Sequence, residues 1–177
     1  YSGSFAKGKG IEIISKISKE TPNIKFHLFG NKNTIYNKSI LNDKTKNVFF
    51  KGYLPYSKLV KKIRNYKVLL MPYQKNVGVL IKNINVADYF SPLKMFEYLA
   101  TGKTILASDL PVYRNILSHN RNCLLIEPEN IGSWKKNILR SLKNKKNVLN
   151  KKALNDAKYF SWKNRVKKII NFLKNDN

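Results

Sequence analysis

A glycine-rich basic segment near the start of the chain has the residue types that bind phosphate groups. It reads Gly3-Ser4-Phe5-Ala6-Lys7-Gly8-Lys9-Gly10 and directly precedes a predicted helix. Glycines allow a tight turn and a close backbone approach to an anion, and the helix start offers free N–H groups and a positive dipole end. Lys9 adds a full positive charge. The spacing fits neither a Walker A loop nor a strict dinucleotide fingerprint, so a flexible loop without a ligand is the alternative.

A second segment, residues 91–102, places a lysine and a glutamate at the start of another predicted helix. Ser91 caps this helix and Pro92 stands in its first turn. Lys94 opposes the helix dipole there, which is unfavourable unless an anion is bound. We expect Lys94 to contact phosphate and Glu97 to accept hydrogen bonds from sugar hydroxyls, with a surface ion pair as the alternative.

The link between the third predicted strand and this helix, residues 73–90, is long and polar. It contains Gly78 and Asp88, and loops of this length in compact domains are often functional. Asp88 is expected either to meet a sugar hydroxyl or to be solvated. The chain has no Ser-His-Asp order and no cluster with metal-ligand spacing, so we expect no metal and no cofactor.

The elements that would position these residues alternate between short strands and amphipathic helices. Strands are predicted at 24–29, 48–50, 67–71, 104–107 and 123–126. Helices are predicted at 9–19, 55–63, 91–99, 112–117 and 133–142. This order predicts an α/β fold, a Rossmann-like three-layer parallel sheet with helices on both faces. Ligands of such sheets bind beyond the carboxyl ends of the strands, where the three segments converge.

The final part of the chain differs in character. We expect a Rossmann-like ligand-binding domain over 1–144 and a helical extension over 145–177, which has no strand pattern. Its last helix, from Ser161, is basic and amphipathic and packs either on its own sheet or on a missing N-terminal domain. Trp134 and Trp162 are predicted to anchor helices. The first apolar strand looks cut through at Tyr1, which indicates an excised piece of a longer protein.

The composition is strongly basic. Among 177 residues, 35 are Lys or Arg and 10 are Asp or Glu, giving a net charge of +25. This favours a polyanion or an anionic membrane surface as partner, although A/T-rich codon usage could produce the same excess of lysine. Arginines are few, which argues against a specific nucleic-acid reader. One cysteine fits a reducing, cytoplasmic location, and no apolar run is long enough to span a bilayer.

Taken together, the motifs resemble those of glycosyltransferase family 4, the group 1 transferases. The strongest likeness lies in Ser91-Pro92-Leu93-Lys94-Met95-Phe96-Glu97-Tyr98-Leu99-Ala100-Thr101-Gly102, and it continues through Lys103 to Asp109. Gly3-Ser4 with Lys9-Gly10, Asn47 to Tyr53, Leu70 to Tyr73 and Asn122 to Ile126 follow in the family's order. The likeness runs through essentially the whole chain and covers only the C-terminal, donor-binding half of such an enzyme.

The resemblance implies a GT-B fold in which this half holds a nucleotide diphosphate sugar. It further implies retaining, metal-independent transfer to a glycan or lipid-linked acceptor, with acceptor binding by a missing N-terminal GT-B domain, so that this chain is inactive alone. Lys9 matches a phosphate-binding lysine, and Glu97 matches the second acid of a Glu-x7-Glu motif, which binds ribose. Gly3, Ser4, Ser91, Pro92 and Leu93 match the backbone around the donor, and Lys9 and Lys94 would stabilise the leaving group.

Two positions depart from the family pattern. The first acid of the motif falls at Tyr89, and Ser4 stands where many members carry an arginine. Two other functions therefore stay open, a non-catalytic GT-B-like binding module and a polyanion-binding domain driven by charge alone.

Overall fold

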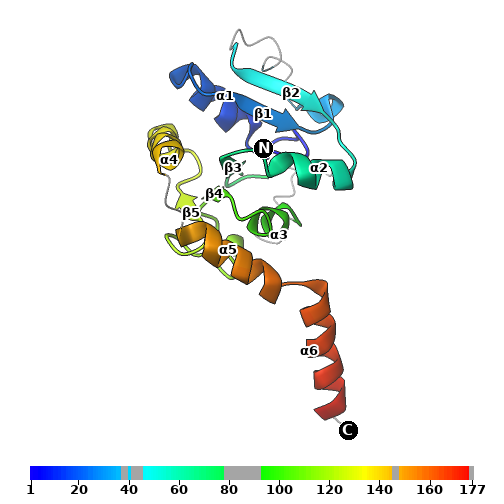
Figure 1. The fold of residues 1–177 in the computed structure, drawn as a ribbon. Coiled ribbons are helices and arrows are strands. Elements are labelled where there is room, and N and C mark those ends of the chain that lie inside the picture. Colours follow the sequence, from blue (N-terminus) through cyan, green and yellow to red (C-terminus); the bar gives the residue numbers. More distant parts are fainter. Residues whose placement is uncertain (37–39, 41–45, 78–92, 145–147, 176–177) are drawn as a thin grey trace.

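The described chain forms two parallel sheets with helices on both faces (Figure 1). The computed structural model describes residues 1–36, 40, 46–77, 93–144 and 148–175. The first sheet pairs β1 (Phe26–Phe29) with β2 (Val48–Gly52). The second has the order β3 (Val68–Met71), β4 (Thr104–Ser108), β5 (Leu124–Ile126). The α/β class and the parallel pairing predicted from the sequence are confirmed.

The chain start lies between the two sheets, where the sequence indicates a first strand. Ser2 forms a parallel bridge with Phe29, and the Phe29 N–H donates to the Tyr1 carbonyl over 2.9 Å. Among the described residues, the strands form two separate sheets instead of the single predicted sheet. A cavity of about 370 Å³ separates the sheets and is lined by Tyr1 together with residues of β1 and β3.

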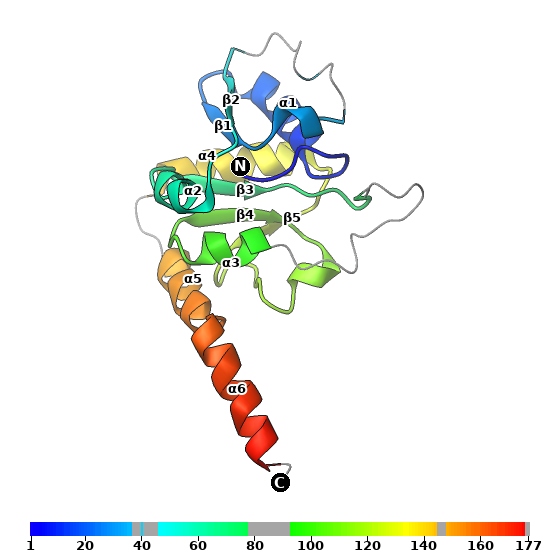
Figure 2. The same ribbon diagram turned by 90° about the vertical axis from the view of Figure 1, so that its right-hand side faces the viewer.

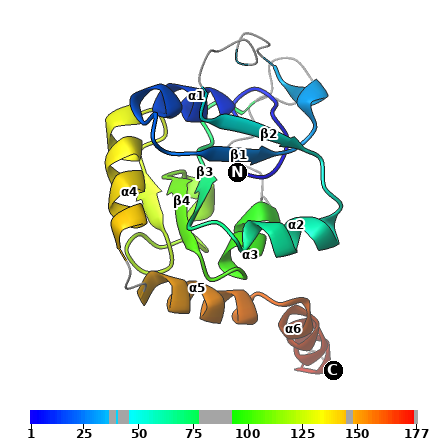
Figure 3. The ribbon, with the colours of Figure 1, turned by 45° about the horizontal axis from the view of Figure 1, so that its top comes forward.

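The helices cover the sheets in two layers (Figures 2 and 3). Their bounds are α1 (Ile11–Glu20), α2 (Tyr56–Ile63), α3 (Leu93–Leu99), α4 (Ile131–Lys143), α5 (Val148–Tyr159) and α6 (Trp162–Asn175). Helix α4 packs against all three strands of the second sheet and also against α1. Helix α3 lies on the opposite side of these strands and contacts α5 (Figure 2). All five residues of β4 are buried, as expected of a central parallel strand covered on both faces.

Local sequence explains where α1 and α4 begin. In α1, Ile13, Ile14 and Ile17 are all buried, which is the apolar stripe that docks the helix. In α4, the Asn130 side chain accepts a hydrogen bond from the Ser133 N–H over 2.9 Å, a typical N-cap. These contacts fix the helices that flank the sheets.

Two expectations about the helical segments are wrong. The helix predicted over 112–117 is a 3₁₀ turn at Pro111–Tyr113, because this stretch is too short to bury a helical face before the chain turns toward β5. Trp134 is buried as expected, but Trp162 is 74% exposed. It begins α6, which projects away from the rest of the molecule and buries none of its apolar side chains (Figures 1 and 2).

The two helices after residue 144 differ in how they pack. Helix α5 packs against α3, and Ala153 is fully buried. Asp156 accepts hydrogen bonds from Arg121 and Asn122, each over 2.7 Å, which tie α5 to the turn before β5. Helix α6 instead leaves six large apolar side chains, from Trp162 to Leu173, between 45% and 74% exposed. Among the described helices, none has the length and apolarity that crossing a membrane requires.

Candidate functional site: a lysine pair at the carboxyl edge of the sheet

The glycine-rich segment packs against the residues that leave β3. The Gln74 N–H donates to the Gly8 carbonyl over 2.9 Å. A Cβ atom on Gly8 would lie 2.1 Å from the Asn76 carbonyl oxygen, and one on Gly10 would lie 2.0 Å from that of Pro72. These two glycines therefore allow close packing of two backbone segments of this chain and do not provide an open approach to an anion. Their packing holds Lys9 beside the carboxyl end of β3.

Gly3 and Lys94 meet although they are far apart in the sequence. A Cβ atom on Gly3 would lie 2.8 Å from the Lys94 Nζ, so this amine packs closely against Gly3, whose φ of 132° favours glycine. The Gly3 N–H donates to the Phe29 carbonyl over 2.8 Å, which anchors the loop to β1. The first and second segments singled out in the sequence thus converge at one edge of the sheets.

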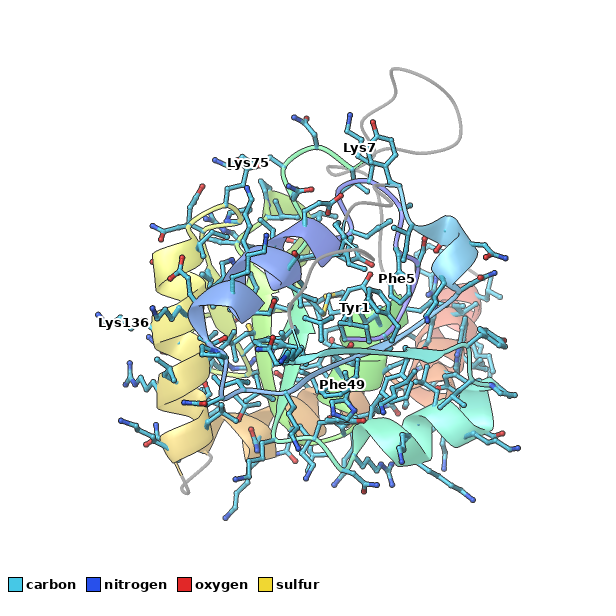
Figure 4. The ribbon with its side chains drawn as sticks, turned by 90° about the horizontal axis from the view of Figure 1, so that it is seen from above. Tyr1, Phe5, Lys7, Phe49, Lys75 and Lys136 are labelled. Atoms are coloured by element: carbon cyan, nitrogen blue, oxygen red, sulfur yellow. The ribbon has the colours of Figure 1, made fainter. Side chains whose placement is uncertain are left out.

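Two tyrosine rings lie beside the lysines. The Lys94 Nζ is 3.8 Å from the centroid of the Tyr1 ring and 4.8 Å from that of Tyr73. The Lys9 Nζ is also 4.8 Å from the Tyr73 centroid, so both lysines contact this ring. Figure 4 shows Tyr1 and Phe5 toward the middle of the molecule, whereas Lys136 extends outward from its edge. The lysine pair is therefore held by aromatic faces, to which cations are attracted.

Lys94 is buried and its ammonium group is unsatisfied. The residue is 7% exposed, and among the described residues its Nζ has no hydrogen-bond partner. Burial and the nearby charge of Lys9 lower the pKa of Lys94 well below its usual value, while Glu97 acts in the opposite direction. Burial also lowers the pKa of Lys9. A buried cation without a carboxylate or carbonyl partner is costly, and an anion at this place would relieve the cost.

Glu97 lies one turn further along α3 and is half-buried. Burial raises the pKa of its carboxyl group, and Lys94 partly offsets this shift. Leu93, at the start of the same helix, is 71% exposed. Because Lys94 is buried, the alternative of a surface ion pair between Lys94 and Glu97 is wrong.

A second hollow adjoins the lysine pair. It encloses about 270 Å³, is mostly apolar, and is lined in part by Ser4, Asn31, Thr34, Tyr53 and Leu54. The Ser4 side chain is exposed, and its hydroxyl accepts a hydrogen bond from the Ala6 N–H over 3.2 Å. Gly3 borders the hollow and also lies against the Lys94 side chain, so the hollow is next to the segment that covers this lysine.

Several predicted site positions fall outside the described residues. These are Ser91 and Pro92, together with Gly78, Asp88 and Tyr89. Within the described ranges, no group of three or more His, Cys, Asp or Glu side chains is placed to hold a metal ion.

The sequence analysis missed the tyrosines that support the site. Besides Tyr1 and Tyr73, the Tyr98 hydroxyl accepts a hydrogen bond from the Ser2 N–H over 2.9 Å. Tyr73 could have been found, because it follows a buried strand by two residues and must lie at the carboxyl edge. Tyr1 and Tyr98 carry no such signal, because their contacts join segments nearly a hundred residues apart.

Comparison with known proteins gives a family and a fold. The family model described as glycosyl transferases group 1 matches residues 1–160. A search of curated protein sequences found no significant match. Among solved structures, TarM is 21% identical with a TM-score of 0.68, and the match covers 97% of this chain and 34% of that one.

Two other solved structures agree. HepE of Anabaena, in complex with UDP and glucose, is 16% identical with a TM-score of 0.75, and the match covers 97% of this chain and 46% of that one. Sucrose-phosphate synthase of Thermosynechococcus elongatus is 17% identical with a TM-score of 0.76, and the corresponding shares are 99% and 45%. The chain therefore spans less than half the length of these three structures. It has the Rossmann-like architecture of GT-B enzymes and belongs to the group 1 glycosyltransferases.

Proposed function

We propose that this chain is the donor-binding, C-terminal half of a family 4 glycosyltransferase. It holds a nucleotide diphosphate sugar, whose sugar passes to a glycan or a lipid-linked acceptor. The observation that carries the proposal is the buried Lys94 amine beside Lys9 and Gly3, which has no hydrogen-bond partner in the part of the chain that the structure describes. This arrangement suits two adjacent phosphates at the carboxyl edge of a parallel sheet.

Lys94 and Lys9 stabilise the leaving group in this proposal. Cleavage of the sugar–phosphate bond leaves negative charge on the diphosphate, and cations already in place lower the energy of that charge without reorganising. The side chains can do this without a metal ion, and we propose that transfer retains the configuration of the sugar.

Glu97 and the neighbouring hollow hold the rest of the nucleotide. A half-buried carboxylate accepts hydrogen bonds from ribose hydroxyls, as acidic residues do in dinucleotide sites. The mostly apolar hollow beside Ser4 has the character to take the base, with Tyr53 and Leu54 against its faces and Thr34 at its polar side. Structures of HepE and of a TarM variant from S. aureus contain UDP, which makes uridine the first base to test.

A second domain completes the enzyme in this proposal, because the matched structures are more than twice as long as the chain. We propose that it binds the acceptor across the carboxyl edge and that α6 docks on it through Trp162, Ile169 and Phe172. The complete enzyme works in the cytoplasm, where nucleotide sugars are made.

The test of α6 is protection of its amides from hydrogen exchange in the longer enzyme. Burial of the apolar side of α6 predicts slow exchange there and fast exchange in the isolated chain. If instead the isolated chain protects α6 only on vesicles rich in anionic lipid, the helix binds a membrane surface and the docking proposal is wrong.

The donor site is tested by calorimetric titration with UDP, GDP and ADP in the absence of metal. Saturable binding of one nucleotide is expected, weakened at least tenfold in Lys94→Met and Glu97→Gln, on the order of 1.4 kcal/mol. Lys136→Met on α4 is the control, because this lysine extends outward at the edge of the molecule (Figure 4). Weak, salt-sensitive binding of every nucleotide, equal in all variants, would instead favour polyanion binding.

The non-catalytic alternative rests on Tyr89, which stands in place of the first acid of the motif. It predicts nucleotide binding without sugar transfer in the longer enzyme. Tyr89→Glu separates the two cases, because a gain of transfer in this variant would show that the natural chain lacks a needed acid.

A further inference from the structure

Lys94 packs against two tyrosine rings, and one of these rings also contacts Lys9. We call the rings of Tyr1 and Tyr73 the tyrosine clamp. The clamp contacts Lys94 from two directions, at 3.8 and 4.8 Å, and Tyr73 also contacts Lys9. The Tyr1 hydroxyl donates to the Ser4 carbonyl over 2.6 Å, which fixes this ring to the glycine-rich loop.

An aromatic face differs from a carboxylate in what it demands of the lysine. A carboxylate partner requires the ammonium form, whereas a ring face packs against a charged or a neutral amine. The clamp can therefore hold Lys94 in place whether or not it carries a proton. We infer that binding of a diphosphate at this site is coupled to uptake of one proton by Lys94, and that the tyrosine clamp keeps the neutral side chain positioned until then.

The proton balance is simple. The Lys94 amine takes a proton from solvent or buffer as the diphosphate arrives, and no covalent bond to the ligand forms. The ammonium group then donates charge-assisted hydrogen bonds to the phosphate oxygens, which accept them. Because two unit charges a few ångströms apart in a partly dry site attract strongly, the bound anion favours the protonated lysine.

The groups around Lys94 decide the pH range in which this coupling is visible. Lys9 contacts the same Tyr73 ring, and Glu97 lies on the helix that carries Lys94. Burial raises the pKa of Tyr73 to about 12 and that of Tyr98 further. Between pH 8 and 9, these tyrosines therefore stay protonated.

The lysines are thus the groups that can change protonation in this range. The second pKa of a phosphate is about 6, so the ligand is fully ionised there as well. Proton uptake requires a lowered pKa in the empty site and a higher one in the occupied site. Affinity therefore falls as pH rises between these two values, by up to tenfold per pH unit, and is level below the lower value.

The experiment is calorimetric titration with UDP at pH 8 to 9 in buffers of different ionisation enthalpy. The dependence of the observed heat on the buffer gives the number of protons taken up. We expect a value approaching one in the natural chain, none in Lys94→Met, and continued uptake in Lys9→Met. Tyr73→Phe should keep both uptake and affinity within about twofold, because the ring face remains.

The affinity for UDP tests separately whether the tyrosine clamp positions Lys94. Tyr73→Leu should weaken UDP about fivefold, while its matched control Tyr159→Leu should change nothing. Tyr159 is a fair control because its ring also lies under a lysine, with the Lys168 Nζ 4.0 Å from its centroid, but Tyr159 is exposed at the end of α5. Equal losses in Tyr73→Phe and Tyr73→Leu would overturn the role of the ring face.

The inference rests on the proposed donor site, yet the two can fail separately. If UDP binds without proton uptake, the coupling is wrong and the donor site stands. If no nucleotide binds but inorganic pyrophosphate binds with proton uptake lost in Lys94→Met, the coupling stands and the nucleotide function falls. If neither binds, both are overturned.

Discussion

The contact between Gly10 and the residues leaving β3 makes a quantitative prediction about stability. Gly10 has φ of 92°, and a Cβ atom there would lie 2.0 Å from the Pro72 carbonyl oxygen and 2.6 Å from its carbonyl carbon. Both atoms are backbone, so the overlap cannot be relieved by turning a side chain. Gly10→Ala must separate α1 from the end of β3.

Two costs add in this variant. A non-glycine residue at positive φ costs about 1–2 kcal/mol. Forcing extra volume into a packed contact costs about 1–3 kcal/mol more, so the total is about 2–5 kcal/mol. Gly52 supplies the matched control, because its φ is 75° and a Cβ atom there would meet nothing within 4 Å. Gly52→Ala should therefore lose only about 1–2 kcal/mol.

The assay is urea unfolding of the natural chain and both variants, with thermal unfolding as a second measure. For a chain of this size, each 1 kcal/mol corresponds to about 2–4 °C in Tm. Gly132→Ala is a third variant, for which we expect no loss of stability. Gly132 is helical, and a Cβ atom there lies no closer than 3.6 Å to its neighbours, so the change should be neutral or stabilising by up to ~1 kcal/mol. Equal losses for Gly10→Ala and Gly52→Ala would refute the close contact and the packing role assigned to Gly10.

Further predictions concern one tryptophan pair, one buried amide and one acid. Trp134→Ala should cost about 3–5 kcal/mol in urea unfolding, because this side chain is fully buried and its Nε1 donates to the Pro128 carbonyl, whereas Trp162→Ala should cost less than about 0.5 kcal/mol. Asn47→Ala should cost about 2–4 kcal/mol, since its Nδ2 donates to the carbonyls of Ser18, Thr21 and Ile24 at 2.9–3.0 Å; an unchanged urea midpoint would show that water replaces it. For Asp156, burial would raise the pKa, but hydrogen bonds from Arg121 and Asn122 outweigh burial and lower it. Its contribution to stability is therefore full above about pH 4 and is lost as pH falls through the lowered pKa, so natural chain and Asp156→Asn should differ at pH 7 and converge in unfolding measured near pH 2.

The sequence alone determined the class of fold and the edge where the candidate site lies. Short apolar runs such as 69–71 and 104–107 are buried on both faces, and that pattern suits a parallel sheet covered by helices. Once the strands are placed, their carboxyl ends must share an edge, so Gly3, Lys9 and Lys94 were expected together there. The same local logic placed α1 and α4 to within a few residues, because a helix cap and an apolar stripe are local features.

Contacts between distant segments were decided only by the tertiary structure. Lys94 looked like one half of a surface ion pair, because an i, i+3 spacing says which residues share a helix face but not whether that face is covered. Burial against Tyr1 and Tyr73 leaves its side-chain nitrogen without a hydrogen-bond partner among the described residues. Trp162 matched the pattern of a helix anchor, yet a pattern cannot say what lies opposite it, and in the structure α6 leaves that face uncovered. Periodicity and capping are set by neighbours in the chain, whereas the protonation and exposure of a side chain are set by whatever the fold brings against it.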